Sequence, residues 1–125
     1  MDSPKKKKIF LIDDEHDFTE LTRALFEFQG FEVEAVNDPL EGFERLQATL
    51  FDAIVVDIMM PEMDGLTLVS KVRKINKYKK TPLFILSAKK LESDERKQLL
   101  NQNVHFIAKP FEPQRLVEIV ADSLF

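Results

Sequence analysis

The sequence contains no cysteine, only three glycines and six prolines, and no long hydrophobic run. Without cysteine it can form neither a disulfide framework nor a thiolate metal site, which fits a reducing cytoplasm. The few glycines and prolines leave little room for long flexible linkers. The apolar stretch after the first lysines spans only Ile9 to Ile12, whereas a secretory signal needs roughly 7–15 apolar residues. No stretch reaches the roughly 18 apolar residues of a membrane helix, so we expect a cytoplasmic protein without a membrane span.

Positive charge is also in deficit. The 125 residues include 18 Lys and Arg against 22 Asp and Glu, which gives a net charge of -4 and a pI near 5.2. This balance argues against a general nucleic-acid binder. Two basic stretches stand out, and for both we favour a solvated surface, with a docking patch as the alternative for the second. They are Lys5 to Lys8, read as a tail that leads into a strand, and the group Lys71, Arg73, Lys74, Lys77, Lys79 and Lys80.

Short apolar runs alternate with helix-like stretches along the chain, and this alternation is typical of a parallel sheet covered on both faces. We predict one domain over residues 1–125 with an α/β fold: a five-stranded parallel sheet of order 2-1-3-4-5, flavodoxin-like and doubly wound with five helices. The expected strands are 8–12, 31–36, 53–58, 82–86 and 105–108. The expected helices are 17–29, one that begins at Asp38 and Pro39, about 66–75, 93–101 and 113–124.

Local signals predict the ends and faces of the first two helices. Asp17 and Glu20 have the spacing of a capping box, and Gly30 is placed to end the first helix. Pro39, directly after Asp38, suits the first position of the second helix. Apolar spacing predicts one buried face for each helix. These faces are Phe18, Leu21, Leu25 and Phe28 in the first, and Leu40, Phe43 and Leu46 in the second.

Polar residues stand at the carboxyl ends of the predicted strands, where open α/β sheets bind their ligands. Asp13 and Asp14 follow the first strand, Asp57 ends the third, Ser87 ends the fourth and Lys109 ends the fifth. Clustered carboxylates repel one another, and a hard cation such as Mg²⁺ relieves that repulsion. Ser87 and Lys109 can stabilise a phosphoryl oxygen. The set therefore indicates phosphoryl transfer, with Asp57 as the nucleophile that forms an aspartyl phosphate.

The chain resembles the receiver domain of bacterial-type response regulators over essentially its whole length. Four motifs carry the resemblance, in order and at matching spacing: IDDE (12–15), VVDIMMPEMDG (55–65), LSA (86–88) and FIAKPF (106–111). One motif alone would be weak evidence, but the four together are very specific.

This resemblance implies a role for each site residue. Asp57 would be the phosphoacceptor, and Asp14 and Asp57 would ligate Mg²⁺ together with the backbone carbonyl of Met59. Asp13 would contact the ion through water. Two further roles follow: Ser87 and Phe106 form the switch pair, and Lys109 is the active-site lysine.

The resemblance also implies partners. A sensor histidine kinase or a phosphotransfer protein would supply the phosphoryl group. An output domain or a downstream protein would bind the face made by the helix over 93–101, the strand over 105–108 and the helix over 113–124. We expect no direct binding of nucleic acid by this domain and no membrane contact.

Three other functions fit part of this pattern. An Asp-nucleophile phosphatase of the haloacid-dehalogenase type needs a second Asp two residues after the first, where this chain has Met59. A flavodoxin-like electron carrier needs a Ser, Thr and Gly-rich loop where this chain has DDEHD from Asp13 onward. A pseudo-receiver would bind partners without phosphorylation, against which the complete acidic set and Lys109 argue. The favoured function is a phosphorylation-dependent switch that assists its own phosphorylation and dephosphorylation and is not otherwise an enzyme.

Overall fold

A computed structural model describes residues 6–57, 65–87, 103–108 and 111–124. Their helices and strands are β1 (Lys8–Ile12), α1 (His16–Phe28), β2 (Glu32–Val36), α2 (Pro39–Ala48), β3 (Ala53–Asp57), α3 (Gly65–Arg73), the 3-10 helix η1 (Asn76–Tyr78), β4 (Leu83–Ser87), β5 (Val104–Ala108) and α5 (Pro113–Leu124). The strands form one parallel sheet of order β2-β1-β3-β4-β5. This confirms the predicted α/β fold. The helix predicted over 93–101 lies outside the described residues, and no helix within them is long and apolar enough to cross a membrane.

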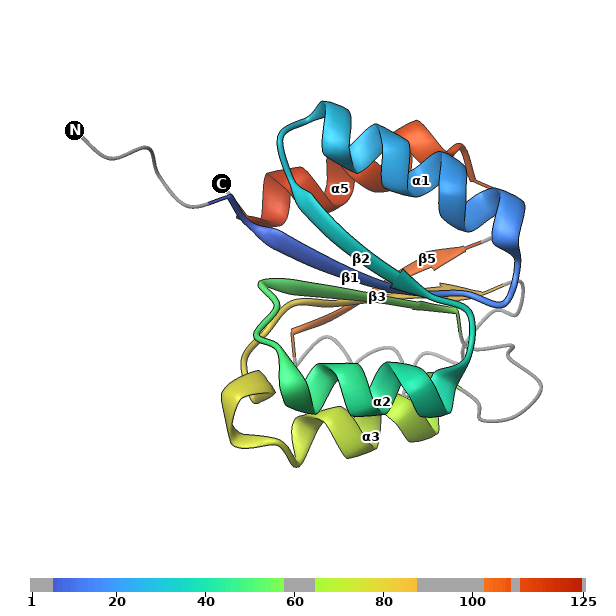
Figure 1. Ribbon diagram of the computed structural model, residues 1–125. Coiled ribbons are helices and arrows are strands. Elements are labelled where there is room, and N and C mark those ends of the chain that lie inside the picture. The colour runs from blue at the N-terminus through green and yellow to red at the C-terminus, as the bar shows by residue number, and fades with distance from the viewer. Residues whose placement is uncertain (1–5, 58–64, 88–102, 109–110, 125) are drawn as a thin grey trace.

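The helices cover both faces of the sheet, with α1 and α5 on one side and α2 and α3 on the other (Figure 1). Successive side chains of a strand point to opposite faces. Phe10 and Ile12 accordingly join the core under α2 and α3, whereas Ile9 and Leu11 join the core under α1 and α5. Every residue of β3 is buried, as expected for a central strand in a parallel sheet.

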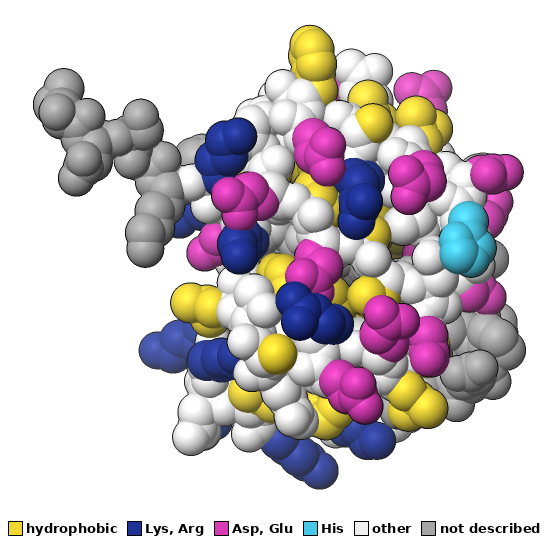
Figure 2. Space-filling model, viewed as in Figure 1, with side chains coloured by type: hydrophobic (Ala, Val, Ile, Leu, Met, Phe, Trp, Pro, Cys, Tyr) yellow, Lys and Arg dark blue, Asp and Glu magenta, His cyan; other side chains and the backbone are white. Residues whose placement is uncertain are grey.

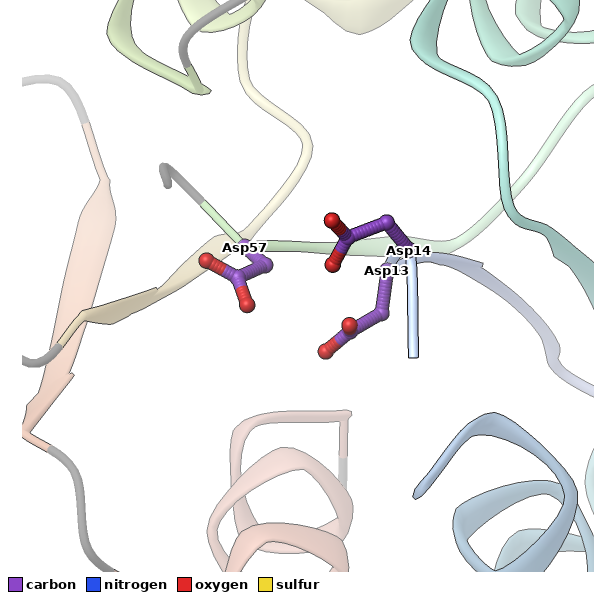
Figure 3. Close-up of side chains that lie close together, drawn as sticks. All are labelled: Asp13, Asp14 and Asp57. Carbon is purple, nitrogen blue, oxygen red and sulfur yellow. The ribbon is translucent and has the colours of Figure 1, made fainter. Parts of the chain in front are cut away.

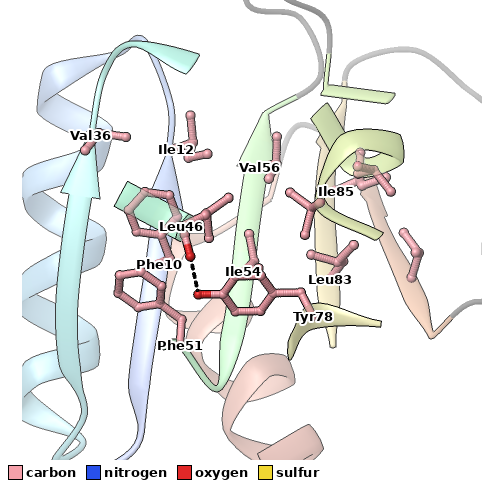
Figure 4. Packing of buried hydrophobic residues seen from close by; sticks show 13 residues of the cluster. Phe10, Ile12, Val36, Leu46, Phe51, Ile54, Val56, Tyr78, Leu83 and Ile85 are labelled. Carbon is pink, nitrogen blue, oxygen red and sulfur yellow. Dashed lines mark hydrogen bonds between the residues drawn. The ribbon is translucent and has the colours of Figure 1, made fainter. Parts of the chain in front are cut away.

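A buried tyrosine connects η1 to the end of α2. The Tyr78 hydroxyl donates to the backbone oxygen of Leu46 at 2.8 Å, drawn in Figure 4, and also to that of Thr49. The ammonium group of Lys77 donates to the backbone oxygens of Gln47 at 2.9 Å and Thr49 at 3.2 Å. The carbonyls at the end of a helix lack hydrogen-bond donors within that helix, and here Tyr78 and Lys77 provide those donors.

The predicted buried face of α1 is partly wrong. Phe18 and Leu25 do pack against the core, but Leu21 is 52% exposed and Phe28 is 88% exposed. The helix instead buries Thr19, Thr22 and Phe26. Thr19 can be buried because its hydroxyl donates to the backbone oxygen of Glu15 at 2.8 Å.

The predicted ends of the first two helices fared differently. The capping box at Asp17 is wrong, because the cap residue is Glu15 and its side chain makes no capping hydrogen bond. Gly30 does follow the end of α1, with a φ of 96° that favours glycine. In α2 the Asp38 side chain accepts from the Leu40 amide at 3.1 Å, as the Asp–Pro pair predicts.

The predicted buried face of α2 is correct at Leu46, which is fully buried, and Phe43 packs at its margin. It is wrong at Leu40, which is 56% exposed. Helix α2 approaches the sheet closely at Gly42, where an added Cβ would lie 2.8 Å from Cδ1 of Ile12. The absence of a side chain at Gly42 therefore lets the helix lie directly on β1.

Candidate metal centre

Three carboxylates meet at the carboxyl edge of the sheet, where β1 and β3 lie side by side. Ile12 of β1 is opposite Val56 of β3, so the residues that follow these two positions emerge next to each other. One carboxylate oxygen from each of Asp13, Asp14 and Asp57 lies within 4.8 Å of the other two (Figure 3). The structure thus brings together the three acidic residues that the strand ends predicted.

This cluster is mostly buried but open on one side. Asp13 is 1% exposed and Asp57 is 3% exposed, whereas Asp14 is exposed to solvent. Closely spaced carboxylates repel one another, and partial burial weakens the screening of that repulsion. The donor set consists of oxygen atoms only, and its open side leaves room for water. These features fit a hard divalent cation such as Mg²⁺, which prefers oxygen ligands and retains part of its water shell.

Hydrogen bonds hold the segment after β1 in place. The Glu15 amide donates to Oδ1 of Asp13 at 2.9 Å. Nδ2 of Asn37 donates to the backbone oxygen of Asp13 at 2.6 Å and lies 3.1 Å from the Thr19 hydroxyl. Asn37 directly follows β2, so it links two loops at the same edge of the sheet. The sequence analysis missed Asn37, although the rule that polar residues follow strands at this edge could have found it.

The remaining predicted site residues differ in what the structure describes. Ser87 is the last residue of β4 and pairs with Ala108, while Asp57 pairs with Leu86, so the ends of β3 and β4 adjoin. Phe106 pairs with Ile85, is half-buried and packs at the margin of the core under α2 and α3. Two further predicted residues, Met59 and Lys109, lie outside the described residues.

The last of the four motifs also has a packing role. Phe111 packs edge-on against Phe18 of α1, with ring centroids 5.6 Å apart. Such a pair is favourable beyond its buried area. It fastens the segment before α5 to α1, close to the end of the sheet that carries the acidic cluster.

A five-stranded parallel sheet with this strand order, and with an acidic cluster where β1 and β3 adjoin, defines a flavodoxin-like domain of the CheY type. The sequence profile of the response regulator receiver domain matches residues 9–121. The chain therefore belongs to the response regulator receiver domain family. Domains of this family are signalling domains of two-component regulatory systems.

Several relatives agree with this assignment. An uncharacterized transcriptional regulatory protein of Bacillus subtilis, YclJ, is 37% identical over 110 residues, which cover 88% of this chain and 47% of that protein. The sensor histidine kinase CheAY of Helicobacter pylori is 32% identical over 124 residues, which cover 98% of this chain and 15% of that protein. The chemotaxis response regulator CheY4 of Vibrio cholerae has a TM-score of 0.84 at 26% identity, covering 96% of this chain and 100% of its own. The chain spans about half the length of the transcriptional regulators it matches.

Proposed function

We propose that residues 1–125 act as a phosphorylation-dependent switch in which Asp57 accepts a phosphoryl group from a sensor histidine kinase or a phosphotransfer protein. The observation that carries this proposal is the position of Asp57, a nearly buried carboxylate at the end of the central strand and beside Asp13 and Asp14. Membership of the receiver family supports it, as does the similarity to a protein named as a sensor histidine kinase.

In the proposed reaction, a carboxylate oxygen of Asp57 attacks the phosphorus atom in line with the departing group of the donor. Asp13 and Asp14 would hold Mg²⁺ with Asp57, and the backbone carbonyl of Met59 is proposed as a further ligand. When bound, the ion would offset the negative charge of the carboxylates and of the phosphoryl oxygens. Asp13 and Asp14 by themselves would repel the phosphoryl group, so the acidic cluster makes acceptance dependent on the cation.

Three further residues are proposed to act at the same edge of the sheet. Ser87 ends β4 and Lys109 directly follows β5, and we propose that both contact phosphoryl oxygens. The movement of Ser87 toward the phosphoryl group would let Phe106 turn inward. An output domain or a downstream protein would then bind the changed face, formed by residues 93–101, β5 and α5.

The proposal is tested with a matched pair of variants at the two ends of β3. Asp57→Asn and Asp52→Asn remove the same charge, but Asp52 lies just before the start of the strand. Its Oδ2 accepts from the Lys8 amide at 2.7 Å, a bond that an asparagine oxygen can retain. With acetyl phosphate and Mg²⁺, intact-mass measurement should show a phosphorylated fraction for the wild type and for Asp52→Asn. Asp57→Asn should remain unlabelled while its circular dichroism is unchanged.

Each alternative outcome identifies a different error. Full labelling of Asp57→Asn would place the acceptor on another residue. Absence of labelling in all three proteins would favour a pseudo-receiver that binds partners without phosphorylation. Catalytic turnover of an added phosphate ester would favour the phosphatase alternative.

A further inference from the structure

The opposite, amino edge of the sheet carries lysines from both basic stretches of the sequence. Two neighbouring clefts of about 580 Å³ and about 620 Å³ lie there, and they share Leu50 and Asp52. Lys77, Lys79 and Lys80 line the first cleft, and Lys6, Lys7 and Lys8 line the second. Figure 2 shows Lys and Arg side chains along the left side of the molecule, where β1 begins in Figure 1. We call the six lysines together with Leu50 the amino-edge surface.

Four of the six lysines are available to a ligand. The Lys8 ammonium nitrogen lies 3.8 Å from a carboxylate oxygen of Glu32. The Lys77 ammonium group is hydrogen-bonded to backbone oxygens at the end of α2. The other four are exposed, and within the described part of the chain no carboxylate forms an ion pair with any of them: Lys6, Lys7, Lys79 and Lys80. A group of like charges at one surface raises the local concentration of an anionic partner.

Leu50 places an apolar group between these charges. Its side chain is 60% exposed, and it forms a common wall of both clefts. The chain on either side is held firmly, because the Thr49 amide donates to the Arg45 carbonyl at 3.0 Å and Phe51 is buried against Phe10. The leucine is therefore presented at a defined position. A single exposed leucine is ordinary, but one set between two lysine-lined clefts is suited to anchor an apolar side chain.

We propose that the amino-edge surface binds an extended acidic peptide segment of a partner protein. One apolar side chain of that segment packs on Leu50, and its carboxylates pair with the four available lysines. The surface lies at the opposite end of β3 from Asp57, so binding does not require phosphorylation. This interaction is independent of the function proposed above.

The chemistry of the clefts favours a peptide over nucleic acid or a membrane. Asp52 and Glu32 lie among the lysines and would repel a continuous phosphate backbone, whereas separate carboxylates can be placed away from them. Arginine binds phosphate groups with two parallel hydrogen bonds, and exposed aromatic side chains stack on nucleic-acid bases. The described residues that line the clefts include neither an arginine nor an exposed aromatic side chain. Asp52 and Glu32 would likewise repel the headgroups of an anionic bilayer.

The test uses the full chain and a fluorescein-labelled peptide of alternating Glu and Asp with a central Leu. Saturable binding is expected by anisotropy at low salt, with amide shifts in NMR spectra concentrated at Leu50, Lys79 and Lys80. Binding should weaken steeply with added salt. The double variant Lys79→Glu, Lys80→Glu should bind about tenfold more weakly, because it reverses two of the four available charges.

Matched controls separate this surface from general charge attraction. Lys71→Glu with Lys74→Glu makes the same charge change at exposed residues that do not line the clefts. Leu50→Ser should weaken binding severalfold, whereas Leu40→Ser, at a leucine of similar exposure on α2, should have no effect. Asp57→Asn should bind as tightly as the wild type.

Three results would overturn the proposal. One is the absence of saturable shifts at millimolar peptide. Another is an equal loss of affinity in the paired control variants. The last is tighter binding of single-stranded DNA of the same net charge, or of phosphatidylserine vesicles, than of the peptide, which would assign the surface to a different class of partner.

Discussion

The two edges of the sheet have opposite charge. The carboxyl edge brings together Asp13, Asp14 and Asp57, while the amino edge brings together the lysines of the amino-edge surface. In Figure 2, Asp and Glu side chains are more frequent on the right of the molecule, whereas Lys and Arg side chains lie mainly on the left and along the bottom, with both kinds in between. The net charge of -4 is therefore a sum that hides the difference between the two edges of the sheet.

The edges also differ in how far their charges are separated from water. The lysines of the amino edge are mainly exposed, so their mutual repulsion is weak and screened by salt. Asp13 and Asp57 are nearly buried, and their repulsion is stronger. Only the carboxyl edge thus holds repulsion that a bound cation can relieve. A ligand at the carboxyl edge should therefore change the stability of the fold, whereas a ligand at the amino edge should change it little.

The largest expected effect is on Mg²⁺ binding. Asp13→Asn with Asp14→Asn removes two of three clustered carboxylates and should weaken Mg²⁺ binding by about 100-fold, or about 2.7 kcal/mol. Glu32→Gln with Asp52→Asn removes two carboxylates from the amino edge and should leave the affinity within about twofold. Isothermal titration calorimetry measures both. Similar losses in the two double variants would mean that the ion responds to net charge rather than to the cluster.

The next effect concerns Tyr78, whose hydroxyl group connects η1 to the end of α2. Tyr78→Phe removes the proton donor of two backbone carbonyls and should lower the free energy of unfolding by about 1–3 kcal/mol. Urea denaturation at neutral pH measures the change. A loss below the error of that measurement would show that the hydroxyl bonds contribute nothing net.

Burial of Tyr78 also predicts an upper pH limit for the stability of the fold. Burial raises the pKa of Tyr78 above its ordinary value of 10.0, because it disfavours the phenolate. The folded state then holds this proton more firmly than the unfolded state. The stabilisation is complete below pH 10 and is lost as the pH rises through the raised pKa. Tyr78 is the only tyrosine, so its ionisation can be followed by ultraviolet absorbance. An ordinary titration midpoint in the folded protein would contradict its burial.

A smaller effect should have opposite signs at the two ends of β3. Without Mg²⁺, Asp57→Asn should raise the free energy of unfolding by about 1 kcal/mol, because it removes one member of a repelling cluster. Asp52→Asn should leave it unchanged or lower it slightly, since Asp52 lies among lysines and accepts from the Lys8 amide. Urea is the suitable denaturant because it adds no ionic strength. Saturating Mg²⁺ should remove or reverse the gain in Asp57→Asn, and stabilisation of both variants alike would refute the comparison.

The smallest effect is expected at Asn37, which links the loops of the carboxyl edge. Asn37→Ala removes the bonds to Asp13 and Thr19 and should lower the free energy of unfolding by about 1 kcal/mol. It should also weaken Mg²⁺ binding by about threefold, because the segment that carries Asp13 and Asp14 becomes less constrained. Asn76→Ala, an exposed residue at the amino edge, is the control and should change neither quantity.

Most of the fold followed from the sequence because strands and helices leave different periodic patterns. The strand order is as predicted, the bounds of the five strands lie within one residue of those predicted, and α5 has its predicted bounds. The buried face of α1 was predicted less well. Apolar spacing selected Leu21 and Phe28, but the helix turns Thr19 and Thr22 inward instead. The Thr19 hydroxyl donates to the backbone oxygen of Glu15, and hydrophobic periodicity cannot predict such a hydrogen bond.

The candidate site shows the same limit. The strand-end rule predicted that Asp13, Asp14 and Asp57 would meet, because parallel strands all end at one edge. It did not identify Asn37, whose side chain contacts a backbone oxygen 24 positions earlier in the sequence. The roles of Ser87, Phe106, Lys109 and Met59 remain proposals.

The parallel sheet and the acidic cluster at its carboxyl edge could be predicted from the sequence, since apolar periodicity and the polar residues after each strand are both local features. That Lys6 to Lys8 lie around Leu50 together with Lys77, Lys79 and Lys80 is visible only in the folded chain. Parallel pairing brings the starts of distant strands to a common edge, but exposed lysines make no local contacts that would mark them as neighbours. Their sequence pattern is therefore the same whether the two stretches are far apart or adjacent, and only the fold distinguishes the two cases.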